Sequence, residues 1–100
     1  MGFIPAGHNL FVIDIEYTVS MDQVSPHLDA HMEFVARGYD QGLFLASGAK
    51  VPRSGGVIIA QGASRAAVEA MMAADPFCQA GIVDLTVTEF IGRNLADVLL

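Results

Sequence analysis

Three histidines and eleven carboxylic acids are the residues of this chain best able to move protons or hold a metal. Two of the histidines, His27 and His31, lie four residues apart in the stretch "SPHLDAHMEF", directly after Ser25 and Pro26. Three kinds of chemistry fit this spacing. The pair could bind a metal ion, one histidine could be an acid–base centre, or both could be ordinary structural residues.

A metal site is the least supported of these readings. Zinc needs three or four ligands, and Asp29, between the two histidines, points about 180° away from them on a helix. The motif lacks the glutamate of a metalloprotease helix, and His8 belongs to an N-terminal segment that we expect to be mobile. We therefore predict no metal ion and no cofactor.

The helical pattern separates the two histidines. One apolar stripe sets the core-facing side of the predicted helix, and it places His31 about 60° and His27 about 100° from the centre of that stripe. His31 is thus the candidate acid–base residue and His27 a solvated neighbour. The structural alternative for His31 is a half-buried imidazole bonded to the backbone. The stripe consists of Leu28, Met32, Val35 and Tyr39.

Asp75 is the candidate partner of His31. It ends the second predicted helix, where the helix dipole disfavours a carboxylate, and it precedes Pro76, so it can cap the next turn. If the two helices pack side by side, Asp75 can approach His31. Its carboxylate would then orient one ring nitrogen and leave the other for a substrate proton.

The elements that must position these residues follow from periodicity and turn signals. Period-two alternation or short apolar runs predict four strands, and helical periodicity after a serine predicts two helices. The order is β-α-β-β-α-β, an α+β ferredoxin-like fold with an antiparallel four-stranded sheet and two helices on one face. We expect a single domain over 1–100, with a core of about 10–90 and a tail of 91–100. The predicted strands are 10–19, 43–47, 57–61 and 81–90, and the helices are 25–41 and 64–75.

The composition limits the kinds of binding partner that we expect for this chain. Hydrophobic residues make up 53% of the chain and charged ones 16%, more apolar material than a small monomer hides easily, which predicts a homodimer or higher oligomer with paired sheet faces. The net charge of −6, with scattered basic residues, argues against nucleic-acid or membrane binding. A single cysteine, Cys78, and the absence of a signal-like N-terminus favour the cytoplasm.

With these residues in place, the chain resembles the YCII-related family of the dimeric α+β barrel superfamily, from about Leu10 to Phe90. The likeness is carried by "LFVIDIEY", by "HMEFVARGYDQGLFLASG" and by "GGVIIAQGASRAAVEAMMAADPF". Its most specific part is "DPFCQAGIVDLTVTEF". The resemblance implies a ferredoxin-like dimer and places the family histidine at His31 and the family aspartate at Asp75.

The chain departs from that pattern at two places. Leu28 stands where many relatives carry an arginine, and Gly48-Ala49 stands where many have Gly-Pro. Three alternatives follow from the missing arginine. The substrates are less acidic than those of the relatives, Arg53 on the neighbouring loop binds the anion or ring oxygen instead, or the site has lost its catalytic activity.

The resemblance implies proton abstraction without a cofactor, as isomerisation or elimination on a small cyclic or aromatic substrate. One relative removes chloride from a chlorinated hydroxyquinol, and a superfamily neighbour isomerises muconolactone. The alternative is a non-catalytic dimeric module that binds a small molecule or serves as an accessory protein.

Overall fold

Four antiparallel strands form one sheet in the order β2-β3-β1-β4, in a computed structural model that describes residues 3–99. The central strand β1 pairs with both β3 and β4, so that Ile13 faces Ile58 on one side and Val87 on the other. This is the predicted ferredoxin-like topology. The strands are β1 (Asn9–Tyr17), β2 (Phe44–Ala49), β3 (Gly55–Gly62) and β4 (Val83–Phe90).

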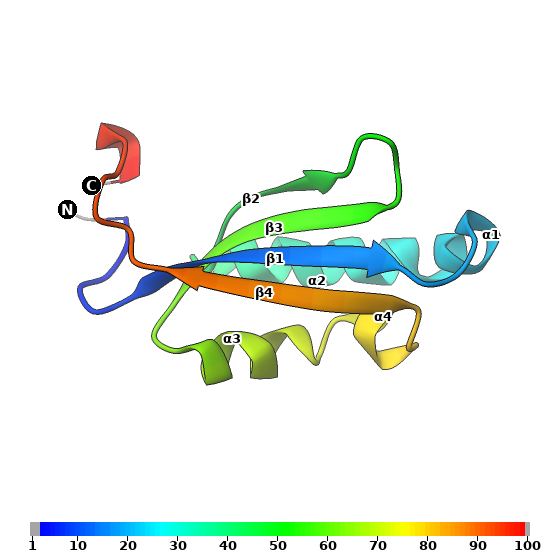
Figure 1. Ribbon diagram of the computed structural model, residues 1–100. Helices are drawn as coiled ribbons and strands as arrows, with labels where there is room; N and C mark the ends of the chain where they lie inside the picture. The colour runs from blue at the N-terminus through cyan, green and yellow to red at the C-terminus, as the bar shows by residue number, and fades with distance from the viewer. Residues whose placement is uncertain (1–2, 100) are drawn as a thin grey trace.

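Helices follow β1 and β3, as expected, but each predicted helix is divided. The first consists of α1 (Met21–Val24), the 3-10 segment η1 (Ser25–His27) and α2 (Leu28–Asp40). The second consists of α3 (Arg65–Met72) and the single turn α4 (Pro76–Gln79). Figure 1 shows α2 behind the sheet and α3 and α4 beside β4. A last 3-10 segment, η2 (Asp97–Leu99), lies in the tail. None of the helices within residues 3–99 is long and apolar enough to cross a membrane.

The helical region starts earlier than the sequence predicted. β1 ends at Tyr17 rather than Val19, and the amides of Gln23 and Val24 already bond the carbonyl of Ser20. Ser25 is therefore not an N-cap, because its hydroxyl donates back to the Met21 carbonyl at 2.9 Å. Burial of Val24 explains the earlier start, since this side chain is 0% exposed and anchors α1 to the core.

The buried face of α2 also differs from the predicted stripe. Met32 and Tyr39 are 53% and 41% exposed, so the helix is turned by about 80° relative to the expected orientation. The cause is a close approach at Gly38, where an added Cβ would lie 2.2 Å from the Phe44 ring. The true buried face consists of His31, Phe34, Val35 and Gly38.

Gly38→Ala tests this close approach. Alanine in a helix interior normally stabilises by about 0.5–1 kcal/mol relative to glycine, whereas overpacking a core costs about 1–3 kcal/mol. We expect the second effect to dominate and the free energy of unfolding, measured in urea, to fall by about 1–2 kcal/mol. Gly48→Ala is the control, because its Cβ would meet nothing within 4 Å. A gain in stability for Gly38→Ala would show that Phe44 does not hold the helix this way.

The helix-facing side of the sheet carries the core. Residues Phe11, Ile13 and Ile15 on β1 are at most 2% exposed, because alternate strand residues point to one face. These side chains pack against α2, α3 and α4 in one cluster. Its members are Phe11, Ile13, Ile15, Val24, Phe34, Val35, Phe44, Ile58, Ala60, Val68, Met72, Phe77 and Ile82.

The opposite face of the sheet carries no helix in Figure 1. Val12 is half-buried there, and the Lys50 ammonium bridges Asp14 at 2.6 Å and Glu16 at 2.5 Å. Hydrogen bonds to these two carboxylates raise the pKa of Lys50, so the lysine stays charged. The face is therefore mixed in character, apolar along Val12 and Ile59 and charged at one end.

The segments outside the sheet meet at its other end. The Phe3 amide donates to the Leu99 carbonyl at 3.2 Å, and Gly92 lies against the buried Leu10. The His8 ring bonds the Gln61 side chain. This contact joins the segment around His8, which we expected to be mobile, to β3.

Candidate active site

His31 lies on the buried face of α2 and is only 9% exposed. It sits closer to the core than the predicted shoulder position, because α2 is rotated toward the sheet around Gly38. Four residues earlier, His27 belongs to η1 and is half-exposed. The structure thus separates the two histidines in the sense that the sequence predicted.

Asp75 is placed by local chain chemistry. The residue before a proline is disfavoured in the helical region, and Asp75 is extended, with φ −61° and ψ 128°. It is the N-cap of α4, and its Oδ1 accepts the Phe77 amide at 3.0 Å. The predicted capping role is confirmed, and substituting such a cap costs about 0.5–2 kcal/mol.

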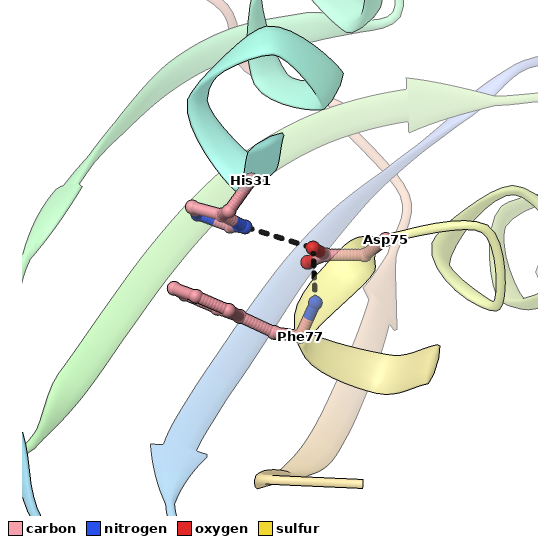
Figure 2. Close-up of polar contacts among 3 residues, drawn as sticks. All are labelled: His31, Asp75 and Phe77. Atoms are coloured by element: carbon pink, nitrogen blue, oxygen red, sulfur yellow. Dashed lines mark hydrogen bonds and ion pairs between the residues drawn. The ribbon is translucent and has the colours of Figure 1, made fainter. Parts of the chain in front are cut away.

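The same oxygen joins Asp75 to the imidazole. His31 Nδ1 lies 2.9 Å from Asp75 Oδ1, and the Asp75 side chain is fully buried. Figure 2 shows this oxygen between the His31 ring and the Phe77 amide. An ionised carboxylate only accepts hydrogen bonds, so beside an ionised Asp75 the imidazole would carry its proton on Nδ1 and keep Nε2 as the basic nitrogen. Within residues 3–99, Asp75 Oδ2 makes no hydrogen bond.

An aromatic ring covers one face of the imidazole. The His31 and Phe77 rings are stacked, with centroids 3.9 Å apart and planes 7° from parallel. Tyr17 meets the Phe77 ring edge-on at 5.9 Å and 88°. The sequence reasoning did not select Phe77 or Tyr17. An aromatic residue two positions after a capping aspartate was the available signal for Phe77.

His31 and Phe77 line a cavity of about 220 Å³ between α2 and the β2–β3 hairpin. Its walls are largely apolar, and Arg53, which is exposed on the hairpin loop, contributes the cation. The loop is tied to β1 by the Tyr17 amide, which donates to the Ser54 carbonyl at 2.9 Å. The other lining residues are Ile15, Tyr17, Leu28, Met32, Val35, Ser47, Gly48, Ala49, Gly55, Gly56, Val57 and Ile58.

This arrangement has the parts of an oriented base. A buried carboxylate can hold an imidazole in one orientation and balance its charge when it takes a proton, and a cation that lines the same cavity, here Arg53, can stabilise a negative oxygen. In the part of the chain that the structure describes, no three His, Cys, Asp or Glu side chains come close enough together to hold a metal ion.

Cys78, two residues beyond Pro76, is not an activated nucleophile. Burial, and after it the charge of Asp75, raise the pKa of this thiol to about 11. The thiolate is the reactive form, so we expect alkylation by iodoacetamide at pH 8 to be roughly 100-fold slower in the folded protein than in urea. The rate in the folded protein should rise with pH toward 11. Equal rates in the two states would contradict the burial of Cys78.

These features define a class, that of the small ferredoxin-like α+β proteins with a helix-borne polar site beside the sheet. Within that class, the chain belongs to the YCII-related domain family, whose model matches residues 9–91. The resemblance seen in the sequence is thereby confirmed.

A solved structure shares the fold. It is 5-chloro-2-hydroxyhydroquinone dehydrochlorinase (TftG) from Burkholderia phenoliruptrix AC1100, in complex with 2,5-dihydroxybenzoquinone. The two chains are 20% identical and superpose with a TM-score of 0.70, covering 81% of this chain and 92% of the other. No curated protein matched the sequence.

Proposed function

We propose that this protein is a small acid–base enzyme that abstracts a proton from a small cyclic or aromatic substrate without a cofactor. The observation that carries the proposal is the 2.9 Å bond between His31 Nδ1 and Asp75 Oδ1, in a pair whose imidazole lines a cavity. His31 is the general base and then the general acid. Asp75 is its orienting partner.

The reaction uses both nitrogens of the imidazole. His31 Nε2 takes a proton from a substrate carbon next to a carbonyl. The electron pair of that C–H bond forms a C=C bond, and the π pair of the carbonyl moves onto its oxygen. Arg53 contacts the resulting oxyanion, and Asp75 balances the imidazolium. The electrons then return from the oxyanion in one of two ways. In isomerisation, a second carbon takes the proton back from Nε2. In elimination, the electrons expel a leaving group such as chloride.

The substrate class follows from the cavity. A volume of about 220 Å³ with apolar walls suits one small ring rather than an extended chain. Leu28, which stands where many relatives carry an arginine, also lines this cavity and brings no charge to it. We therefore assign Arg53 as the cation that contacts the substrate's oxygen. The structurally similar dehydrochlorinase, which acts on a chlorinated hydroquinone, supports a ring substrate of this kind.

A homodimer is part of the proposal. The sheet face without helices carries half-buried Val12, Val57 and Ile59, and pairing two such faces would remove that apolar surface from water. We expect light scattering at micromolar concentration to give twice the chain mass of 10.6 kDa, or a larger multiple. A stable 10.6 kDa species would contradict this assembly.

Chloride release and proton exchange test the activity directly. 5-Chloro-2-hydroxyhydroquinone is the first probe, followed by a set of enolisable and halogenated ring compounds. Chloride is measured by electrode and the loss of a carbon-bound deuterium by NMR. Turnover by the wild type that disappears in His31→Gln supports the proposal, with His27→Gln as the matched control.

The alternative is a non-catalytic dimeric module that binds a small molecule in the same cavity. Leu28 favours it, because this position lacks the arginine that many relatives carry and so removes one anion contact. Calorimetric titration of the same ring compounds separates the two functions. Tight binding without turnover, unchanged in His31→Gln, would favour the module over the enzyme.

A further inference from the structure

Phe77 contacts both members of the His31–Asp75 pair by different atoms. Its ring is stacked on the imidazole at 3.9 Å, and its backbone amide donates to Asp75 Oδ1, the oxygen that accepts from His31 Nδ1. Figure 2 shows the two rings one above the other, with the carboxylate at their edge. One residue therefore contacts the carboxylate through its main chain and the base through its side chain.

We propose that Phe77 is a positioning residue for the His31 base, which its ring holds in plane and stabilises when protonated. This inference rests on the proposed function for its catalytic consequence. The geometric part of the proposal, that the Phe77 ring lies on the His31 ring and fixes its plane, rests on the stacking alone. No role in the site was expected for Phe77 from the sequence.

The ring fixes the direction of the basic nitrogen. The Nδ1 bond to Asp75 leaves the imidazole free to tilt about that bond, and a parallel ring at 3.9 Å removes this freedom. Nε2 then lies in a plane set by Phe77, which is itself only 2% exposed. Tyr17 packs edge-on against Phe77 at 5.9 Å and keeps that ring from shifting.

The ring also favours the charged intermediate. The face of an aromatic ring is the negative part of its quadrupole, and a cation within about 6 Å of it is attracted. An imidazolium formed at His31 lies within that distance, while the Asp75 carboxylate meets it at its edge. Two partners thus stabilise the charge that appears when Nε2 takes the proton, and the neutral ground state gains less.

The expected kinetic signature is a loss in kcat. Phe77→Leu keeps the backbone amide and an apolar side chain but removes the ring, and we expect kcat to fall roughly 2- to 30-fold with little change in KM. Phe77→Tyr keeps the ring and should retain most of kcat. Phe11→Leu is the matched control, because Phe11 is fully buried but lies by Gly62 on β3 and is not among the residues that line the cavity.

An NMR measurement decides the geometric part without any substrate. In the wild type, the carbon-bound ring protons of His31 should be shifted upfield of those of His27, since they lie over an aromatic face. This shift should be lost in Phe77→Leu and kept in Phe77→Tyr and Phe11→Leu. Wild-type His31 protons without an upfield shift, or an upfield shift that survives in Phe77→Leu, would overturn the role of Phe77.

The two proposals fail in different ways. An intact upfield shift that depends on Phe77, in a protein that turns over none of the ring compounds, would refute the enzyme and leave the placement of His31 by Phe77 standing. Turnover that needs His31 but is the same in Phe77→Leu as in the wild type would refute the role of Phe77 and keep the enzyme. If Phe77→Leu does not fold, the wild-type shift relative to His27 still decides the geometric part.

Discussion

His31→Gln is expected to lower kcat on the ring substrate by about 10²- to 10⁴-fold, the usual contribution of a positioned acid–base group. Glutamine is similar in size to histidine and polar, so it can donate to Asp75, but it has no basic nitrogen at neutral pH. Steady-state kinetics with the compound that the wild type turns over provides the measurement. Circular dichroism establishes that the variant is folded.

His27→Gln provides the comparison within the same helical region. His27 is half-exposed and is not among the residues that line the cavity, so this substitution should leave kcat and KM unchanged. A loss of kcat in His27→Gln equal to that in His31→Gln would mean that both histidines serve the reaction. The separation between them would then be wrong.

Asp75→Ser is expected to reduce kcat by roughly 10- to 150-fold, the equivalent of a hydrogen bond to a charged group. Serine is a good N-cap, so α4 should still form. Its side chain is too short to take the place of the carboxylate that meets His31 Nδ1 at 2.9 Å. The variant therefore removes the orienting contact and the balancing charge while it retains the cap.

Asp75→Asn separates the charge from the acceptor. The amide oxygen can still accept from His31 and from the Phe77 amide, but the negative charge is lost and an amide group is buried at the position of Oδ2, which has no partner within residues 3–99. We expect a smaller kcat loss than in Asp75→Ser. If Asp75→Ser had the kcat of the wild type, the carboxylate would be a cap only.

The fold was largely predictable because its signals are local. Alternation in "LFVIDIEYTV" and in "GIVDLTVTEF" indicated two strands, and in the structure β1 has one buried face and β4 one half-buried face. Ser64 was predicted to cap a helix, and its side chain accepts the Ala67 amide at 3.1 Å. Gly42 was predicted to end a helix, and its φ of +72° is the left-handed conformation that such a position favours.

The orientation of α2 was not predictable from the same signals. Leu28, Met32, Val35 and Tyr39 form an apolar stripe by spacing, yet Met32 and Tyr39 are exposed. What decides the rotation is a tertiary contact, the approach of Gly38 to Phe44 on the neighbouring strand. A glycine in a helix interior does not by itself reveal such an approach, because the sequence does not say which side chain packs against it.

The candidate site could also be predicted only in part, because some of its contacts are tertiary. His31 and Asp75 could be selected by helix position and by the chemistry of a residue before proline, and the structure brings them to 2.9 Å. Arg53 lines the same cavity, although the sequence suggested it only through the resemblance. The stacking of Phe77 on the imidazole depends on how α4 docks against α2, which no local pattern encodes.

The most direct measurement of the central claim is the tautomer of His31, read from the ¹⁵N chemical shifts of its two ring nitrogens at neutral pH. The oriented base requires the proton on Nδ1 and a bare Nε2 in the wild type, and a loss of this preference in Asp75→Ser. A proton on Nε2 in the wild type, or the same tautomer in both proteins, would contradict the proposal that Asp75 prepares His31 to accept a substrate proton.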